Sequence, residues 1–168
     1  MSQLTGSRII NAIIGLFSAL DSTDQTLLKK CLAQKKIKID MSDSATAATA
    51  FTKSLLWYND TGVDCRVISA KATAPVAVTA NATNYATFQV SKLDSAGANA
   101  AVVAAFATDT VTTDDMVANV SKDMTLTAAN VIVPAGSYLV AEITKTASGV
   151  AVTAATSRAV VEVRVEPT

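Results

Sequence analysis

The sequence predicts a mainly β protein, an antiparallel β-sandwich that is jelly-roll-like and preceded by a short N-terminal helical segment. Beyond residue 50, short stretches of alternating apolar and polar residues recur at intervals of roughly ten residues. Turn-forming groups such as Asn59-Asp60-Thr61-Gly62 separate them. Because no helical periodicity lies between these stretches, antiparallel sheets packed face to face are favoured over an α/β fold.

The first part of the chain has a helical pattern. Ile9, Ile13, Leu16 and Leu20 recur at three- and four-residue intervals and predict a helix with a broad apolar face. This face either closes one end of the sandwich or docks onto a partner or another subunit. The apolar stretch is too short to cross a bilayer, so no membrane partner is expected, although the core of a secretion signal remains an alternative.

A second helix is predicted to follow the first. Ser22-Thr23-Asp24-Gln25 has the form of a capping box, and the helix would end near Gln34 with lysines closing its last turn. Ile37–Asp40 alternates and is expected to be a short edge strand. With the Ser/Ala/Thr-rich segment Met41–Ala50, these elements form an N-terminal arm and linker over residues 1–50, ahead of a sandwich domain at 51–168.

The clearest predicted strand is Tyr85–Leu93. Ala86, Phe88 and Val90 fall on one face of it, and polar residues alternate with them on the other. The remaining expected strands are Thr52–Tyr58, Val63–Ala70, Val76–Ala80, Ala100–Ala107, Met116–Thr125, Asn130–Val133, Tyr138–Thr144 and Arg158–Glu166. Inward positions are expected at Val63, Cys65, Val67, Leu139, Ala141, Ile143, Val161, Val163 and Val165.

Four turns connect these strands. Asn59–Gly62 has the strongest hairpin signal, and Asn81–Asn84, Asp94–Gly97 and Pro134–Gly136 also combine short polar side chains, proline or glycine. The sequence therefore predicts tight reversals at these four places.

Charge and composition exclude several kinds of partner. Lys plus Arg and Asp plus Glu each total 14 in 168 residues, so the net charge is zero and no nucleic-acid partner is expected. The densest basic run comprises Lys29, Lys30, Lys35, Lys36 and Lys38. A basic end complementing a helix dipole is favoured for it over a phosphate-binding patch.

The residue types that most catalytic and metal sites need are absent or scattered. The chain has no histidine, and Cys31 and Cys65 form no CxxC pair, so both are expected to be reduced thiols. Asp109, Asp114 and Asp115 fall in a threonine-rich segment that is expected to be a solvated loop rather than an acid–base pair or a calcium site. No enzymatic activity, and no catalytic, cofactor-binding or metal-binding residue, is expected.

The adjacent aromatic residues Trp57 and Tyr58 have two interpretations. An exposed pair could stack on a sugar ring, as in a carbohydrate-binding module. On an alternating strand, however, one of two neighbours points into the core, and this interpretation is favoured.

Three segments carry a family resemblance: Pro75–Ala80, Asn84–Val90 with the Asp94–Gly97 turn, and Val131–Leu139 with its Val-Pro-Ala-Gly turn. In texture they resemble the small β-sandwich proteins of tailed bacteriophages that decorate the head or form short head fibres. The resemblance extends over about Pro75 to Glu166, and the helical N-terminal segment departs from the most compact of these proteins.

This resemblance implies a non-enzymatic virion protein that is made in the host cytoplasm and sits on the capsid surface. It would bind the major capsid protein, stabilise the lattice as a decoration or cement protein, and self-associate, commonly as a homotrimer. Two alternatives stay open: a head-fibre, tail-fibre or baseplate accessory protein, and a carbohydrate-binding or adhesive β-sandwich module.

Overall fold

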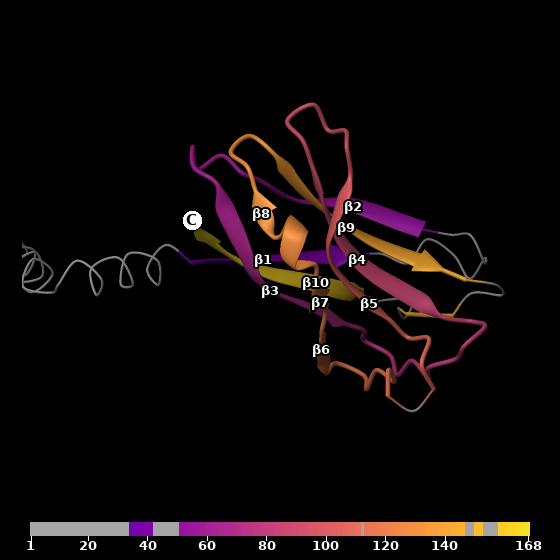
Figure 1. The fold of residues 1–168 in the computed structure, drawn as a ribbon. Coiled ribbons are helices and arrows are strands. Elements are labelled where there is room, and N and C mark those ends of the chain that lie inside the picture. The colour runs from indigo at the N-terminus through magenta and orange to yellow at the C-terminus, as the bar shows by residue number, and fades with distance from the viewer. Residues whose placement is uncertain (1–33, 42–50, 112, 147–149, 153–157) are drawn as a thin grey trace, which may run out of the picture. The chain divides into compact units, whose positions relative to one another are not determined.

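A computed structural model describes residues 34–41, 51–111, 113–146, 150–152 and 158–168 of the chain (Figure 1). The chain divides into two compact units, Met1–Gln34 and Lys35–Thr168. The predicted helices, Lys29, Lys30 and Cys31 lie outside the described residues, and so does most of the Met41–Ala50 linker.

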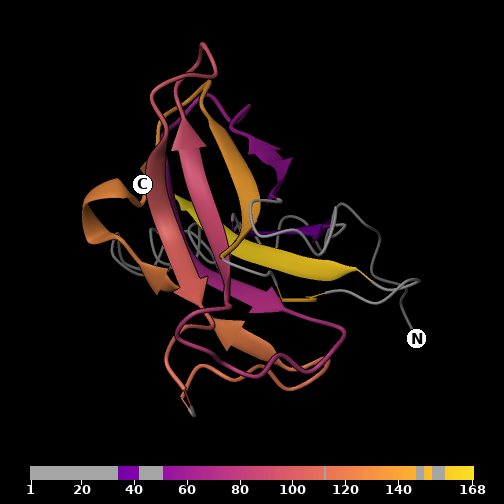
Figure 2. The ribbon, with the colours of Figure 1, turned by 90° about the vertical axis from the view of Figure 1, so that its right-hand side faces the viewer.

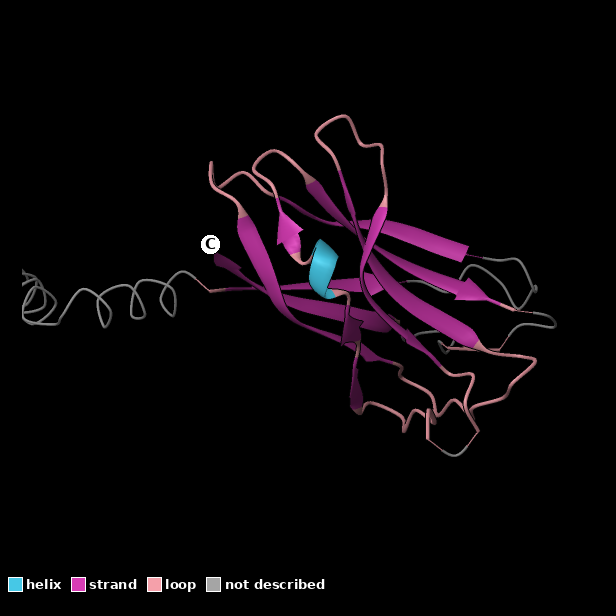
Figure 3. Ribbon diagram, viewed as in Figure 1, coloured by secondary structure: helices cyan, strands magenta, loops and turns pink. Residues whose placement is uncertain are grey.

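The described part of the second unit consists of ten strands and one short 3-10 helix (Figure 3). The strands are β1 (Lys35–Met41), β2 (Phe51–Tyr58), β3 (Cys65–Thr73), β4 (Ala86–Leu93), β5 (Ala101–Ala107), β6 (Ser121–Asp123), β7 (Thr125–Leu126), β8 (Ile132–Val133), β9 (Tyr138–Lys145) and β10 (Ala159–Pro167). The 3-10 helix η1 spans Ala128–Asn130.

These strands form two antiparallel sheets. Sheet A has the order β1-β10-β3-β6, with β8 also paired to β3, and sheet B has the order β2-β9-β4-β5-β7. In Figure 2 the strands of sheet B cross β10 of sheet A, drawn in yellow, at a steep angle. Because β1, β2 and β3 alternate between the sheets, the connectivity is that of a jelly roll, and the predicted fold class is confirmed.

The core lies between the two sheets and is made by strict alternation. Val161, Val163 and Val165 of β10 are at most 2% exposed, and the intervening charged residues point outward. Leu139, Ala141 and Ile143 on β9, and Ala86, Phe88 and Val90 on β4, face them from sheet B. The inward positions predicted on these three strands are therefore confirmed, because a strand with one buried face needs a period of two.

The segment Asn59–Gly62 turns as predicted, but it does not close a hairpin. Gly62 has a φ of 75°, in the left-handed region that favours glycine. The strands on either side nevertheless belong to different sheets, since β2 pairs with β9 and β3 pairs with β10. The hairpin prediction was wrong because turn residues specify a local reversal and carry no information about which strand is the partner.

Several short strands also differ from the prediction. Val76–Ala80 is not a strand; it is held by one isolated bridge in which the Val78 and Met116 amides each donate to the other's carbonyl at 2.9 Å. The predicted strand Met116–Thr125 is reduced to β6 and β7, and Asn130–Val133 is reduced to β8. Val63 precedes β3 and is 49% exposed, whereas Cys65 and Val67 are buried as expected.

The sandwich begins at Lys35 and not near Ala50. β1 pairs with β10 along its whole length, from Lys35 opposite Val165 to Met41 opposite Ala159. Met41 is fully buried in the core. The expected edge strand at Ile37–Asp40 is thus part of sheet A, and its lysines sit on a strand instead of ending a helix.

Candidate functional site

Two of the three loop carboxylates that were considered for catalysis hold backbone amides. Asp115 Oδ1 accepts a hydrogen bond from the Ala80 amide at 2.6 Å, and Asp114 Oδ2 accepts one from the Thr110 amide at 3.2 Å. Asp109 is exposed. Within the described ranges, no group of three or more His, Cys, Asp and Glu side chains could hold a metal ion. The expectation of a loop at these residues is confirmed.

Cys65 is a free, buried thiol at the start of β3. Its Sγ donates weakly to the Asn59 side-chain oxygen at 3.8 Å. The thiol therefore packs as part of the turn that connects the two sheets. In the part of the chain that the structure describes, no helix has the length and apolar character needed to cross a membrane.

Of the two adjacent aromatic residues, Trp57 lies in the core and Tyr58 on the surface, as the favoured interpretation predicts. Trp57 is 7% exposed and lies opposite the fully buried Leu139, whereas Tyr58 is 44% exposed. The Lys35 ammonium sits 5.7 Å from the centre of the Trp57 ring. The indole Nε1 has no hydrogen-bond partner among the described residues. A platform that exposes both rings is therefore ruled out.

The most distinctive surface is an apolar patch on the outer face of sheet B, which we call the tyrosine patch. It comprises Leu55, Tyr58, Leu93 and Tyr138, which lie around Val140, a residue of the same face that is only 5% exposed. The strand register places these residues together, because Leu55 lies opposite Val140, and Tyr138 lies between Tyr58 and Leu93. The Tyr58 and Tyr138 rings are tilted by 37° with their centres 4.9 Å apart. Leu55 is 58% exposed, so the patch presents aliphatic as well as aromatic surface.

Polar groups border the tyrosine patch along the sheet. Lys53 Nζ and Glu142 Oε1 form an ion pair at 2.6 Å in the row next to Leu55 and Val140. On β4, the Gln89 side chain donates to Ser91 Oγ at 2.9 Å. An apolar centre with a polar rim is the usual anatomy of a protein–protein interface.

Three turns lie at one end of the patch. The Gly136 amide donates to the Asn59 carbonyl and the Asn59 amide donates to the Ser137 carbonyl, both at 2.9 Å. Gly136 has a φ of 78°, and a Cβ built on it would lie 3.9 Å from both the Tyr58 hydroxyl and Ser95 Cβ. The predicted Pro134–Gly136 turn is confirmed, and it lies close to the Tyr58 hydroxyl.

The Asp94–Gly97 turn is also confirmed and carries a perturbed carboxyl. Asp94 Oδ1 accepts hydrogen bonds from the amides of Ala98 and Ala96, both at 2.9 Å, and Oδ2 accepts one from Asn99 Nδ2 at 2.6 Å. The pKa of Asp94 is lowered because these hydrogen bonds favour the charged carboxylate. The Ala98 amide has the largest effect, followed by the Asn99 side chain, and the Ala96 amide also contributes. This turn directly follows Leu93 of the patch.

The patch combines exposed aliphatic and aromatic surface from neighbouring strands. Sequence reasoning singled out Tyr58 but missed Leu55, Leu93 and Val140, because each is an ordinary strand residue until its cross-strand neighbour is known. The bulge between Leu55 and Trp57 changes which residues of β2 share a face, and no local pattern announces it.

Comparison with known proteins finds similarity only among solved structures. No known protein family and no curated protein matches the chain. The structure of the infectious bursal disease virus Gx strain is similar with a TM-score of 0.37 and 12% identity, over 80% of this chain and 32% of that chain. The VP2 subviral particle of the same virus is similar with a TM-score of 0.35, 12% identity and the same coverage.

An enzyme structure is similar to the same degree. It contains the CBM22-1 and GH10 modules of Clostridium thermocellum endo-1,4-beta-D-xylanase 10B complexed with xylohexaose. The TM-score is 0.32 and the identity 13%, over 82% of this chain and 25% of that chain. This chain therefore spans a third or less of the length of these three structures.

Proposed function

We propose that the chain is a non-enzymatic virion structural protein that binds the outer surface of a phage capsid lattice and stabilises it as a decoration protein. Its partner is the major capsid protein, it acts on the virion surface as a homotrimer, and it needs no cofactor. The tyrosine patch carries this proposal as the surface that contacts the capsid.

The exposed side chains of the patch suit it for a modest contact that is repeated many times. Burying the exposed parts of Leu55 and Tyr58, 58% and 44% of each residue, would contribute about 1 kcal/mol each. Together they amount to about 2 kcal/mol, or roughly a 30-fold gain in affinity. Three linked copies would multiply this gain, because the second and third contacts form at high effective concentration.

Three further features support the proposal. The resemblance to phage head proteins is carried by the segments Pro75–Ala80, Asn84–Val90 with the Asp94–Gly97 turn, and Val131–Leu139. The jelly-roll connectivity is one that viral capsid domains use repeatedly, which is a fold-level analogy. The zero net charge allows many copies to pack side by side without strong repulsion.

Quantitative mass spectrometry of purified virus particles tests the location. We expect hundreds of copies per particle in a simple ratio to the major capsid protein. A few copies per particle would instead indicate a head-fibre, tail-fibre or baseplate position. Complete absence from the particles would refute the virion assignment.

A matched pair of variants tests the patch itself. Leu55→Asp places a charge in the patch, and Val117→Asp places the same charge on a residue that is 61% exposed. Val117 lies between β5 and β6. The Asp94–Gly97 turn precedes β5, whereas Val117 follows it, so Val117 is a control residue outside the patch. We expect Leu55→Asp to lower binding to particles stripped of the protein at least tenfold and Val117→Asp to leave it unchanged. Equal binding by both variants would exclude the patch as the capsid contact.

A carbohydrate-binding module is the second candidate function. The paired rings of Tyr58 and Tyr138 on an open sheet face favour it, since such rings can stack on a sugar. A glycan array separates the two candidates. Glycan binding that is lost in Tyr58→Ala would support the module, and the absence of glycan binding would leave the decoration proposal in place.

A further inference from the structure

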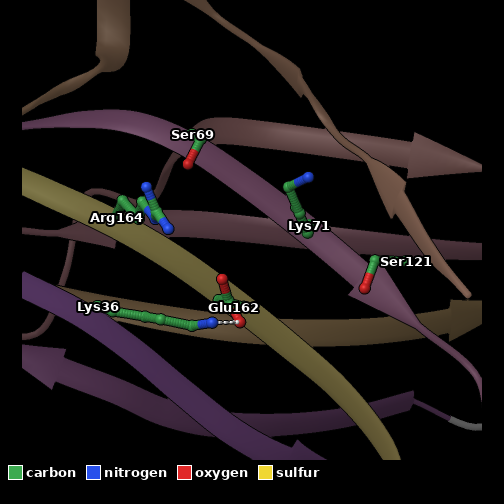
Figure 4. A pocket seen from close by; sticks show the side chains of 6 residues that line it. All are labelled: Lys36, Ser69, Lys71, Ser121, Glu162 and Arg164. Atoms are coloured by element: carbon green, nitrogen blue, oxygen red, sulfur yellow. Dashed lines mark ion pairs between the residues drawn. The ribbon is translucent and has the colours of Figure 1, made fainter. Parts of the chain in front are cut away.

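The outer face of sheet A contains a polar hollow of about 400 Å³, on the opposite side of the sandwich from the tyrosine patch. It spans β1, β10, β3 and β6, which are distant in sequence but adjacent in the sheet. Figure 4 shows the six side chains that line it: Lys36, Ser69, Lys71, Ser121, Glu162 and Arg164. A volume of this size falls in the range of small-ligand sites.

Two of the three positive charges in the hollow are already neutralised. Lys36 Nζ lies 2.7 Å from Glu162 Oε2, the ion pair drawn in Figure 4. Lys71 Nζ lies 3.1 Å from Asp123 Oδ1 on the neighbouring strand β6. Glu162 and Asp123 are thus each paired with a lysine.

Arg164 is the charge that remains. Its cross-strand neighbours are Lys36 on β1 and Ser69 on β3, and neither can accept an ion pair. No other described residue forms an ion pair with the exposed Arg164 guanidinium. A free guanidinium presents N–H donors in a fixed fork that matches the two oxygens of a carboxylate.

We propose that this hollow is a binding site for a singly charged carboxylate, which the Arg164 guanidinium holds through two parallel N–H···O bonds and the Ser69 hydroxyl supports as a third donor. Among the six lining residues and Asp123, three cationic and two anionic side chains leave one positive charge in excess. A monoanion neutralises that excess. A phosphate dianion would exceed it and would meet stronger repulsion from Glu162.

Titration of the full ¹⁵N-labelled chain, followed by NMR, tests the site with three probes. Sodium glucuronate represents a sugar acid, N-acetyl-glutamate methylamide represents a glutamate side chain of a protein, and inorganic phosphate represents a dianion. We expect at least one carboxylate to shift amide resonances of β10 and β3 saturably, with a dissociation constant of about 1 mM. The carboxylate with the higher affinity identifies the source of the ligand as a sugar acid or a protein side chain.

Three variants identify the residue responsible. Arg164→Gln is expected to weaken binding about tenfold, and Arg164→Lys, which keeps the charge but not the fork, to weaken it by a smaller factor. Arg66→Gln is the matched control, because Arg66 is an exposed arginine on β3 that does not line the hollow. Its affinity should equal that of the wild type. Retained stability of the exposed Arg164 variants, measured by urea unfolding, shows that any loss arises from the site.

Several results would overturn the proposal. The first is the absence of amide shifts at β10 and β3 with either carboxylate up to about 20 mM. The second is an equal loss of carboxylate affinity in Arg66→Gln and Arg164→Gln. The third is tighter binding of phosphate than of both carboxylates. The site is on sheet A and the tyrosine patch is on sheet B. Failure of this proposal and failure of the capsid-binding proposal are therefore distinguishable.

Discussion

Asn59 joins the two sheets at the end of β2, and Asn59→Asp is expected to destabilise the sandwich strongly. The side chain is 1% exposed. Its Nδ2 donates to the carbonyls of Val63 and Val133, both at 2.9 Å, and its Oδ1 accepts a bond from Thr61 Oγ1 at 2.7 Å. Aspartate has nearly the same shape, so the substitution removes the two donors without leaving a cavity.

The magnitude follows from those contacts. Two lost hydrogen bonds account for about 2 kcal/mol, and leaving two carbonyl oxygens facing a carboxylate adds about 1 kcal/mol or more. The total of about 3 kcal/mol corresponds to a fall of roughly 10 °C in Tm for a domain of this size. Burial beside carbonyl oxygens raises the pKa of the introduced carboxyl in the folded state, because its protonated form can donate one bond. The loss relative to wild type should therefore be smallest in acid and should grow as the pH rises through that raised pKa.

Urea unfolding of the full chain near pH 8 and near pH 4, compared with wild type at each pH, measures both effects. Asn81→Asp is the matched control. Asn81 Oδ1 only accepts bonds, from the amides of Thr83 at 2.8 Å and Asn84 at 2.9 Å, and a carboxylate accepts them equally well. Its stability should stay within about 0.5 kcal/mol of wild type. If Asn59→Asp also stayed within about 1 kcal/mol of wild type near pH 8, Asn59 would not be the tie between the sheets that its hydrogen bonds indicate.

Three other perturbations probe the core, the start of the domain and the acid response. Phe88→Ala, at a ring that is fully buried, is expected to lower the free energy of unfolding by about 4 kcal/mol in urea, and a loss below about 1.5 kcal/mol would indicate a loosely packed core. Removal of residues 1–34 should leave the sandwich folded but reduce its incorporation into particles. Removal of residues 1–50 also deletes β1 and uncovers β10, so it should lower the urea midpoint of unfolding. Equal urea midpoints for the two truncated chains would contradict a sandwich that starts at Lys35. Hydrogen bonds, chiefly from the Ala98 amide, lower the pKa of Asp94 from 3.8. The charged carboxyl therefore stabilises the fold above about pH 4, and that contribution is lost as the pH falls through the lowered pKa. Asp94→Asn should accordingly make the free energy of unfolding less dependent on pH in acid. Parallel decline of wild type and variant in acid would refute this role.

The parts of the fold that sequence predicts well are those in which one strand carries its own evidence. Phe88 and Val90 alternate with polar residues because β4 buries one face, and that requirement is visible locally. Pairing is not local. The Asn59–Gly62 turn looks the same whether it joins neighbours in one sheet or crosses between two sheets, and the choice depends on β9 and β10 far along the chain. The lysines of β1 likewise suggested a helix end until β10 was seen beside them.

The candidate sites also depend on strand pairing that no local pattern shows, and the two sites lie on different sheets. Each member of the hollow is an ordinary solvent-facing strand residue, and only the order β1-β10-β3-β6 gathers Lys36, Lys71 and Arg164. The two outer faces of a sandwich are free to diverge because neither contributes to the core: here sheet A is charged and sheet B presents Leu55 and Tyr58. Substitutions on opposite faces share no partners, so their effects should add. In the double variant Leu55→Asp/Arg164→Gln, the loss of capsid binding should equal that of Leu55→Asp alone, and the loss of carboxylate binding should equal that of Arg164→Gln alone. A single continuous interface would instead couple the two losses.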